Sequence, residues 1–297
     1  MSKLRIWHEG RLVDPSAIAV SPLAPALHYG LGVFEGIRAY GTAAGPAIFR
    51  LDAHMARMAK GAEALGLAFD PEACAQGCRA VMDDSGLRDA YIRPLAFFAQ
   101  GTLGLDVDQH TTHTLVAAIP WQNHLGDAAL AGVRAQCSPL RRNAARAIPP
   151  LKLCGGYVNS ILAKRAAARA GFEEAIFQDD QGFVVEATGE NIFMVKAGRF
   201  TAVEHPDALP GITRASLIEL TGAESRPVLL AELLEADEVF LTGTSAEVAP
   251  LRALGERTWK PGPITTELAA HYQELVHGRV PERGAWLTPV QGAACPA

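Results

Sequence analysis

The sequence predicts an α+β fold made of two lobes, and three observations support this prediction. The chain has 297 residues, about twice the length of an ordinary domain. Hydrophobic residues make up 49% and charged residues 20%, a balance typical of globular proteins. Strand-like and helix-like segments alternate, and the Pro- and Gly-containing stretch 120–126 interrupts them. We therefore expect lobes at 1–122 (small) and 130–297 (large), joined by a linker at 123–129.

The elements of the first lobe follow from local residue patterns. Glu9-Gly10 is a hairpin signal, and Asp52 is a candidate N-cap for a helix with apolar residues at helical spacing. Pro94 would place its strand at the edge of a sheet or at a bulge. The predicted elements are a hairpin of 3–7 with 11–13, helices over 52–65 and 71–82, and strands over 91–98 and 114–119.

The second lobe shows the same mixture of patterns. Gly171 is a stop signal for the helix before it, and the polar turn 179–182 separates two apolar segments. The predicted elements are a strand over 132–136, a helix over 157–170, hairpins of 174–177 with 183–186 and of 191–195 with 200–203, helices over 213–221 and 263–277, and a strand over 238–241.

Charge and cysteine usage exclude several classes of protein. Lys plus Arg is 27 and Asp plus Glu is 32, so the net charge of −5 argues against a general nucleic-acid binder. No apolar stretch approaches the ~18 residues of a membrane span, and the first residues lack a secretory pattern. The five cysteines are scattered, without a Cys-x-x-Cys knuckle. We expect a cytoplasmic protein with reduced thiols, no metal site and no membrane partner.

One lysine, Lys152, lies in a segment that favours amine chemistry. Two prolines and two glycines flank it in the otherwise apolar stretch 148–157. Partial desolvation there favours the neutral, nucleophilic amine. The alternative is a surface lysine that buries only its stem, which is the common case for a lone lysine. Tyr157 follows at a predicted helix start, where it is either a hydrogen-bonding group or a half-buried aromatic residue.

Acidic and anion-binding candidates lie further along the chain. Glu186 and Glu190 follow a hydrophobic strand, where a carboxylate either meets a bound cation or belongs to a solvated turn. Gly211 lets the backbone approach a ligand, and the N–H groups of Ile212 and Thr213 then point at an anion. Thr213 is also a candidate cap, and an ordinary capped helix is an equal alternative.

Two more segments suit an anion. The stretch 242–247 places small hydroxyl residues around Gly243, which predicts either an anion-binding nest or a polar turn. Arg57 shares a helix face with His54 and either aims at a phosphate or is solvated. A lysine, an acid and phosphate-binding groups are together what a pyridoxal phosphate site needs. No Walker loop, Gly-x-Gly-x-x-Gly after a strand, His-Glu-x-x-His or Gly-x-Ser-x-Gly competes with this interpretation.

Together these segments resemble the fold-type-IV pyridoxal-phosphate enzymes, and most closely the bacterial branched-chain amino acid aminotransferases. Each motif alone is weak to moderate, and their order over more than two hundred residues carries the resemblance. The matching segments are 26–30, 33–38, 54–57, 91–94, 152–157, 189–191, 209–214 and 242–247. The resemblance implies a two-lobe architecture with the active site between the lobes and the Schiff-base lysine, Lys152, in the large lobe.

The resemblance also implies a role for each matching residue. Lys152 is expected to be the Schiff-base lysine and proton carrier, Glu190 the partner of the pyridine nitrogen, and Tyr157 a donor to the ring oxygen. The implied phosphate-binding residues are Arg57, Ile212, Thr213 and Thr244, and Gly243 is a further implied cofactor-binding residue. The implied substrate-binding residues are Tyr29, Phe34, Tyr91, Arg93, Trp121, Ser245 and Ala246.

The implied function is transamination of branched-chain L-amino acids with 2-oxoglutarate. Phe34 and Trp121 suit an aliphatic chain, and the Tyr91-x-Arg93 pattern suits a side-chain carboxylate. The alternatives on the same fold are a D-amino acid or (R)-amine transaminase and an enzyme like aminodeoxychorismate lyase. A non-catalytic small-molecule binding protein is the alternative from another class. The implied partners are small amino acids, 2-oxo acids and at least one further copy of the chain.

Overall fold

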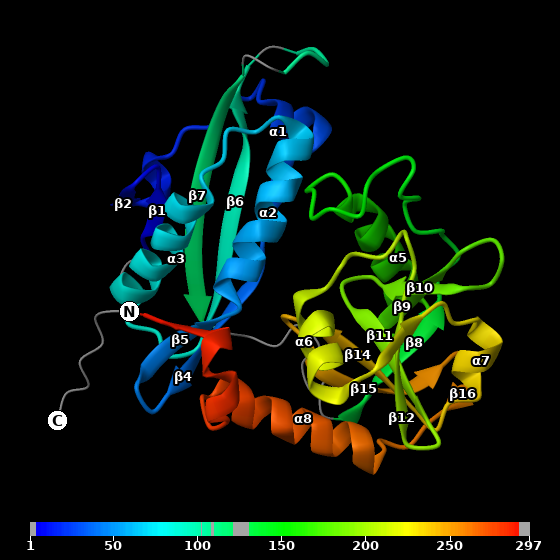
Figure 1. Ribbon diagram of the computed structural model, residues 1–297. Helices are drawn as coiled ribbons and strands as arrows, with labels where there is room; N and C mark the ends of the chain where they lie inside the picture. Colours follow the sequence, from blue (N-terminus) through cyan, green and yellow to red (C-terminus); the bar gives the residue numbers. More distant parts are fainter. Residues whose placement is uncertain (1–3, 102, 108–109, 121–130, 291–297) are drawn as a thin grey trace. The chain divides into compact units, whose positions relative to one another are not determined.

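The computed structural model describes residues 4–101, 103–107, 110–120 and 131–290, which form two compact units of mixed helix and strand (Figure 1). One unit lies within Met1–Gln122, Leu151–Gly155 and Glu274–Ala297, and the other within Asn123–Pro150 and Gly156–Gln273. This mixture confirms the predicted α+β class. The expected lobe boundaries stay a prediction, and the expected linker at 123–129 lies outside the described residues.

An antiparallel sheet, whose strands differ in length, forms the centre of the first unit. Its described strands run in the order β17-β5-β4-β6-β7-β1-β2, with β3 also paired to β6. The predicted hairpin around Glu9-Gly10 is confirmed, with both residues at positive φ. The strands are β1 (Ile6–His8), β2 (Arg11–Val13), β3 (Gly32–Phe34), β4 (Ile37–Thr42), β5 (Gly45–Phe49), β6 (Ala90–Gln100), β7 (Thr111–Pro120) and β17 (Leu287–Pro289).

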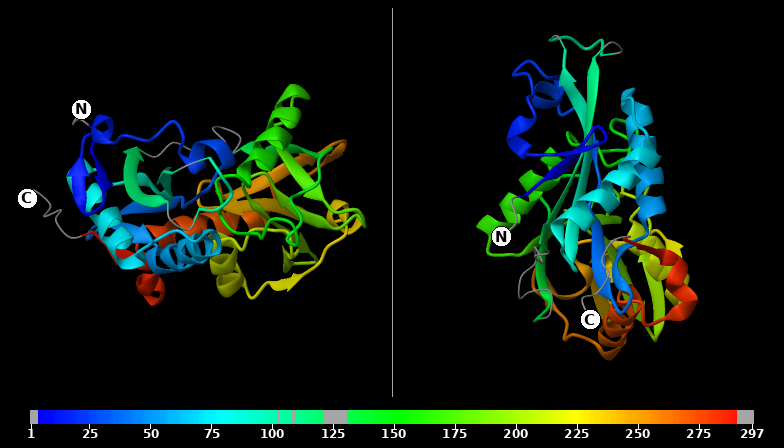
Figure 2. Two further views of the ribbon diagram at one scale, coloured as in Figure 1. Left: turned by 90° about the horizontal axis from the view of Figure 1, so that it is seen from above. Right: turned by 90° about the vertical axis from the view of Figure 1, so that its left-hand side faces the viewer.

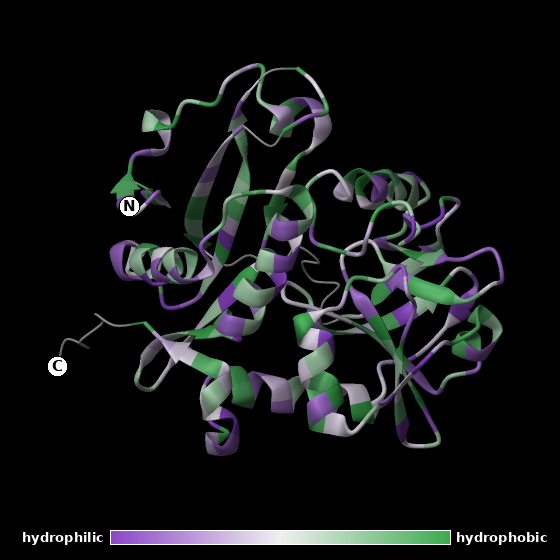
Figure 3. Cartoon of the chain, turned by 45° about the horizontal axis from the view of Figure 1, so that its top comes forward, coloured by the Kyte–Doolittle hydropathy of each residue, from purple (hydrophilic) through white to green (hydrophobic). Residues whose placement is uncertain are grey.

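Two amphipathic helices, α2 (Leu51–Leu65) and α3 (Pro71–Ser85), pack on one face of this sheet (Figures 1 and 2). Polar and apolar residues alternate along both helices (Figure 3). Met58 of α2 and Val81 of α3 are buried in one core with Val116 of β7. The short elements of this unit are η1 (Pro15–Ala17), α1 (Pro25–Tyr29) and η2 (Pro281–Trp286).

The expected N-cap of α2 is wrong. The helix begins at Leu51, and its N-cap is Arg50, held at a φ of 52°. Asp52 lies in the first turn, where a carboxylate still favours the positive end of the helix dipole. The backbone N–H of Arg50 donates to the carbonyl of Trp286 at 2.7 Å, so a partner far along the chain fixes where this helix starts.

The expected edge or bulge at Pro94 is also wrong, because β6 lies inside the sheet between β4 and β7. The residue opposite Pro94 on β7 is Val116. On its other side, β4 pairs with β6 up to Ile92 and β3 pairs with it from Leu95, so Pro94 faces the gap between two partner strands. The missing N–H of proline therefore breaks no ladder bond there.

The second unit is built on a longer sheet with the order β10-β9-β8-β15-β14-β11-β12-β13 and β16 beside β15. Both predicted hairpins, β9 with β10 and β11 with β12, are confirmed. The strands are β8 (Val133–Cys137), β9 (Glu174–Gln178), β10 (Val184–Ala187), β11 (Asn191–Lys196), β12 (Arg199–Val203), β13 (Glu224–Arg226), β14 (Glu238–Gly243), β15 (Glu247–Leu254) and β16 (Arg257–Thr258).

Small residues allow helix α5 to pack closely on the second sheet. Ala163 and Ala167 of α5 pack on Phe177 and Val185, which brings the helix backbone close to β9 and β10. The helices that begin in this unit are α5 (Tyr157–Arg169), α6 (Ile212–Thr221), α7 (Leu230–Leu234) and α8 (Pro263–Val276), whose last residues belong to the first unit. Among the residues described, no helix is both long and apolar enough to cross a membrane.

Candidate active site

The backbone around Lys152 is fixed by pairing with β3. The N–H of Phe34 donates to the Lys152 carbonyl at 3.2 Å, and the N–H of Cys154 donates to the Gly32 carbonyl at 2.8 Å. Leu153, opposite Val33, points into the core. Because successive residues in an extended segment alternate in direction, the Lys152 side chain points away from that core. The segment therefore holds the lysine in a defined place within the first unit, whereas the lobe boundaries expected from the sequence put it in the large lobe.

Three expected site residues of the first unit gather at Lys152. Its ammonium nitrogen lies 4.9 Å from the centre of the Phe34 ring. The Arg93 guanidinium lies 4.7 Å from the same ring and donates to the Tyr91 hydroxyl at 2.8 Å. A side chain at Gly36 would overlap that hydroxyl, so the glycine makes room for the tyrosine. The result is an amine and a guanidinium beside one aromatic face.

Arg57 forms a two-pronged ion pair that sequence reasoning did not foresee. Its Nε donates to Glu35 Oε1 at 2.7 Å, and its Nη2 donates to Glu35 Oε2 at 2.8 Å. His54 Nδ1 lies 2.8 Å from Glu35 Oε2. Because an ionised carboxylate only accepts, Nδ1 carries the proton. A glutamate next to Gly36 in an otherwise apolar stretch was the available signal for this partner.

This buried trio has strongly shifted pKa values. Burial opposes ionisation of Glu35, but the charge of Arg57 and the His54 hydrogen bond outweigh it and hold the pKa of Glu35 well below its usual range. Burial also lowers the pKa of His54, against the opposing effect of Glu35, and the charges of Arg57 and Lys152 lower it further. The trio is therefore an ionised carboxylate between a guanidinium and a neutral imidazole.

Acidification should destabilise the protein through these two groups. An unfolded chain binds a proton at His54 near pH 6.5, whereas the folded chain does not until lower pH, so the free energy of unfolding falls as pH drops below about 6.5. Glu35 adds the same sign below about 4.5. Urea unfolding between pH 7.5 and 5 measures how steeply the free energy of unfolding changes with pH. In His54→Gln this slope should be smaller than in wild type, by up to about 1.4 kcal/mol per pH unit. His271→Gln, at an exposed histidine, is the control; equal slopes in His54→Gln and wild type would contradict this assignment.

In the second unit, Glu190 lies beside the end of β14. Its side chain is 3% exposed, and a Cβ added at Gly243 would lie 3.6 Å from Glu190 Cγ. Thr242, paired with Asn191 across the strands, has a buried hydroxyl without a hydrogen-bond partner among the described residues. The buried carboxylate thus lies next to Gly243, at the end of β14, and near the unsatisfied hydroxyl of Thr242.

A second buried carboxylate, Glu174, adjoins Glu190. Lys164 donates to Glu174 Oε2 and Thr188 Oγ1 to Glu174 Oε1, each at 2.5 Å. Burial raises the pKa of Glu174, and the charge of Glu190 raises it further, while Lys164 opposes both. Lys164 therefore supplies the positive charge that allows two carboxylates to lie close together.

The loop before α6 is held by a buried glutamate. Glu186 accepts from Arg142 Nε at 2.7 Å and from the N–H of Leu209 at 3.0 Å, and Asn191 Nδ2 donates to the Leu209 carbonyl at 2.9 Å. The expected capping by Thr213 is wrong, because α6 begins at Ile212 and its N-cap is Gly211. The glycine at the N-cap makes no side-chain hydrogen bond to this end of the helix, and the first N–H groups of a helix are suited to bind an anion.

Tyr157 is the first residue of α5, as predicted, and its neighbours Gly156 and Asn159 belong to the same network. Arg142 Nη1 donates to Asn159 Oδ1 at 3.1 Å, and Asn143 Nδ2 donates to the Gly156 carbonyl at 3.2 Å. Residues 244–246, among them the expected ligands Thr244, Ser245 and Ala246, form the turn between β14 and β15. One network thus fixes the start of α5 and the loop before α6.

The expected site residues fall into two groups, each described within its own unit. Lys152, Arg57, Phe34, Tyr91 and Arg93 belong to the first unit, together with Tyr29, whose side chain is exposed. The group in the second unit consists of Tyr157, Glu190, Ile212, Thr213, Gly243, Thr244, Ser245 and Ala246. Trp121 lies outside the described residues.

The residues present fit a phosphate-bearing aldehyde cofactor. They include a lysine amine on a rigid backbone, a buried carboxylate, an uncapped helix N-terminus and an unsatisfied buried hydroxyl. By contrast, no group of three or more His, Cys, Asp or Glu side chains in the described part of the chain is arranged to hold a metal ion.

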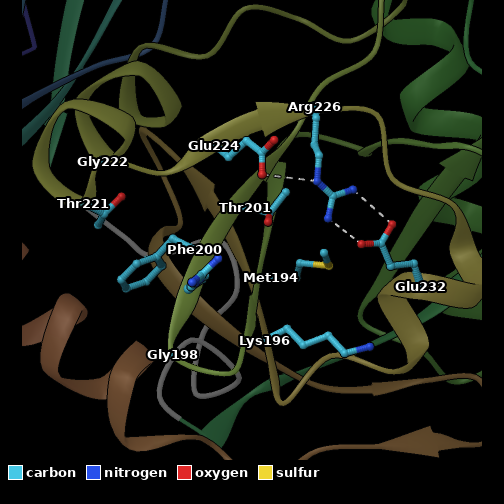
Figure 4. Close-up of a pocket in the computed structure, with 11 residues that line it drawn as sticks. Met194, Lys196, Gly198, Phe200, Thr201, Thr221, Gly222, Glu224, Arg226 and Glu232 are labelled. Atoms are coloured by element: carbon cyan, nitrogen blue, oxygen red, sulfur yellow. Dashed lines mark hydrogen bonds and ion pairs between the residues drawn. The ribbon is translucent and has the colours of Figure 1, made fainter.

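A surface pocket of about 580 Å³ in the second unit lies elsewhere (Figure 4). Met194 and Phe200 contribute apolar surface, and Arg226 is already paired with Glu224 and Glu232. None of its lining residues is an expected site residue.

Comparison with known proteins identifies the family of the chain. Residues 32–254 match the family described as amino-transferase class IV. The chain is 35% identical to the branched-chain-amino-acid aminotransferase of Pseudomonas aeruginosa, over 96% of this chain and 97% of that protein. It is 38% identical to that of Salmonella typhimurium, with the same coverage.

Solved structures give the same result. The branched-chain aminotransferase from Thermoproteus uzoniensis with norvaline superposes with a TM-score of 0.91 at 36% identity, covering 97% of this chain and 99% of that one. The branched-chain amino acid aminotransferase from Thermobaculum terrenum in its PLP-form gives a TM-score of 0.88 at 30% identity, covering 96% and 98%. The fold is that of the fold-type-IV aminotransferases, and the chain belongs to the class IV aminotransferase family.

Proposed function

We propose that this protein transfers the amino group of branched-chain L-amino acids to 2-oxoglutarate with pyridoxal 5'-phosphate as cofactor. The observation that carries the proposal is the cluster at Lys152, where the amine and the Arg93 guanidinium flank the Phe34 ring. Such a cluster offers an apolar face to an aliphatic chain and a cation to a carboxylate, beside the nucleophile that an aminotransferase needs.

One pocket must accept two unlike substrates. Phe34 and, in this proposal, Trp121 contact the branched aliphatic side chain, whose burial is favourable at about 25 cal/mol per Å². The 2-oxoglutarate side chain ends instead in a carboxylate, which Arg93 and the Tyr91 hydroxyl bind. Tyr29 lines the same pocket, and the backbone of Ser245 and Ala246 binds the carboxylate shared by both substrates. The dual specificity thus depends on Arg93 lying against an aromatic ring.

The remaining expected residues serve the cofactor. When bound, the cofactor supplies an aldehyde that carries the amino group and a ring that accepts electrons. Lys152 would hold the cofactor at rest, and its freed amine would carry the proton between the substrate α-carbon and the cofactor. Glu190 would give the ring nitrogen a negative partner, and Tyr157 would donate to the ring oxygen. Arg57, the N–H groups of Ile212 and Thr213, and Thr244 would bind the phosphate, with Gly243 beside the cofactor.

Both sets of relatives support this proposal. The curated relatives are named as branched-chain-amino-acid aminotransferases, and the solved relatives include one in PLP-form and one with norvaline. We further propose that the chain works in the cytoplasm as a homodimer or higher homo-oligomer. The exposed Val158, Ile161 and Leu162 on α5 support association, because apolar clusters on a surface favour a partner. Sedimentation equilibrium of the holoprotein measures the assembly.

A donor screen tests the function directly. The holoprotein is incubated with 2-oxoglutarate and L-leucine, L-isoleucine, L-valine, D-alanine or (R)-1-phenylethylamine, and glutamate formation is measured. We expect turnover with the three branched L-amino acids and at most trace turnover with the other two. Activity on the amine or the D-amino acid alone would overturn the proposed substrate class while leaving the cofactor assignment intact.

The variant Arg93→Ala sharpens this test. We expect the KM for 2-oxoglutarate to rise on the order of 10- to 100-fold, because a charge-assisted carboxylate contact is lost, while the half-reaction with L-leucine changes by about threefold at most. Arg88→Ala, at an exposed arginine next to β6, is the control and should alter neither half-reaction. Equal losses in the two half-reactions of Arg93→Ala would argue against carboxylate binding by Arg93.

A further inference from the structure

We propose that Glu35, held in turn by His54, is a positioning residue that orients the Arg57 guanidinium toward the cofactor phosphate. This inference rests on the proposed function, in which Arg57 binds that phosphate. It assigns a task to two side chains that are not among the expected site residues. Three observations in the first unit carry it.

The first observation is the geometry of the ion pair. Glu35 engages Arg57 through Nε and Nη2, at 2.7 and 2.8 Å, with one carboxylate oxygen for each nitrogen. Two parallel bonds fix the plane of a guanidinium, whereas a single bond leaves it free to rotate. With that plane fixed, the direction of Nη1 is set by the protein before any ligand arrives.

The second observation is burial. Glu35 and His54 are fully buried, and the Arg57 side chain is only 10% exposed. His54 Nδ1 donates to the oxygen that also accepts from Arg57 Nη2, so the carboxylate cannot rotate away from the fork. Because water does not compete inside the protein, these bonds keep their strength. The orientation of Arg57 is therefore rigid, which lowers the entropic cost of phosphate binding.

The third observation is where the chain places Glu35. It lies in the break between β3 and β4, and its N–H donates to the Pro94 carbonyl at 3.0 Å. The preceding residue, Phe34, hydrogen-bonds the backbone of Lys152 and lies under its amine. The carboxylate that holds Arg57 and the strand that holds Lys152 are thus neighbours in the chain. One rigid segment sets the positions of both cationic side chains.

A purely structural ion pair would have a different consequence. Its loss would lower stability and weaken every ligand alike. A positioning role instead affects only ligands that carry the phosphate. Pyridoxal, which has the same ring and aldehyde but no phosphate, separates these two cases.

The experiment measures the dissociation constants of pyridoxal 5'-phosphate and of pyridoxal for the apoprotein, from the visible absorbance band and tryptophan fluorescence. In Glu35→Gln we expect the constant for pyridoxal 5'-phosphate to rise on the order of 10- to 100-fold, with that for pyridoxal within about twofold. Arg57→Ala should show the same loss of selectivity, and Glu35→Gln in the Arg57→Ala background should add nothing to it. Glu173→Gln, which breaks the comparable Arg134 pair in the second unit, is the control and should change neither constant.

Each other outcome overturns the inference. Equal weakening of both ligands in Glu35→Gln, or additive losses in the double variant, would show a structural pair only. If Glu35→Gln does not fold, Glu35→Asp takes its place, because aspartate keeps the charge but has a shorter side chain. We expect at least a roughly threefold loss of selectivity for the phosphate-bearing ligand in Glu35→Asp. Wild-type selectivity in Glu35→Asp would overturn the inference. Unchanged selectivity in Arg57→Ala would also overturn the inference. The proposed function would still stand in that case, since cofactor binding and turnover would persist. If the wild-type protein binds neither ligand, the proposed function itself fails.

Discussion

Replacing Lys152 with alanine should abolish transamination and leave the fold intact. The lysine is expected both to hold the cofactor and to carry the proton, and loss of both roles should slow each half-reaction by about 10⁴-fold or more. The fold should survive because the contacts that fix this segment are made by its backbone, which alanine retains, and by the buried Leu153. Single-turnover rates with L-leucine, together with urea unfolding, check the two halves of this prediction.

Two comparisons make the result specific to Lys152. Lys196→Ala, at an exposed lysine paired with Glu235, should keep wild-type turnover. Borohydride reduction of the wild-type holoprotein, followed by peptide mapping, should place the cofactor mass on the peptide that contains Lys152. Ordinary turnover in Lys152→Ala, or reduction onto another lysine, would remove the basis of the proposed function.

The elements that local patterns determine were predictable from the sequence. The hairpins β9–β10 and β11–β12 and the body of α3 depend on alternation, turn residues and helical spacing within a few residues. The start of α2 was not predictable, because the N–H of its N-cap residue Arg50 binds Trp286. Pro94 was misplaced for a related reason: its tolerance inside the sheet depends on two different strands that end on either side of it.

Side-chain partners show the same limit. Lys152 and Arg93 could be named from short motifs, but their shared contact with Phe34 depends on how β3 pairs with the segment 151–155. The partner of Arg57 lies 22 residues away, and nothing in the spacing singles out Glu35 among the acidic residues. Spacing along a helix predicts which residues share a face, whereas the partner on the other side is set by tertiary packing.

Removing the charge of Glu190 should cost catalysis far more than stability. Glutamine keeps the size and one carbonyl oxygen but cannot stabilise a positively charged ring nitrogen, so we expect kcat to fall on the order of 10²- to 10³-fold. Stability should change little or rise, because Glu190 lies against Glu174 and its charge is one of the causes that raise the Glu174 pKa. The measurements are the two half-reaction rates and the free energy of unfolding of the apoprotein.

A buried carboxylate with a different task provides the matched control. Glu238 is 6% exposed and accepts the N–H groups of Ile264 and Thr265 at 3.1 and 2.7 Å, where it caps the first turn of α8. Glu238→Gln should therefore lower the free energy of unfolding by about 1 kcal/mol and leave kcat unchanged. The reverse pattern in Glu190→Gln identifies a carboxylate that acts on the cofactor. If Glu190→Gln loses stability and keeps kcat, Glu190 is a structural residue and the ring nitrogen has another partner.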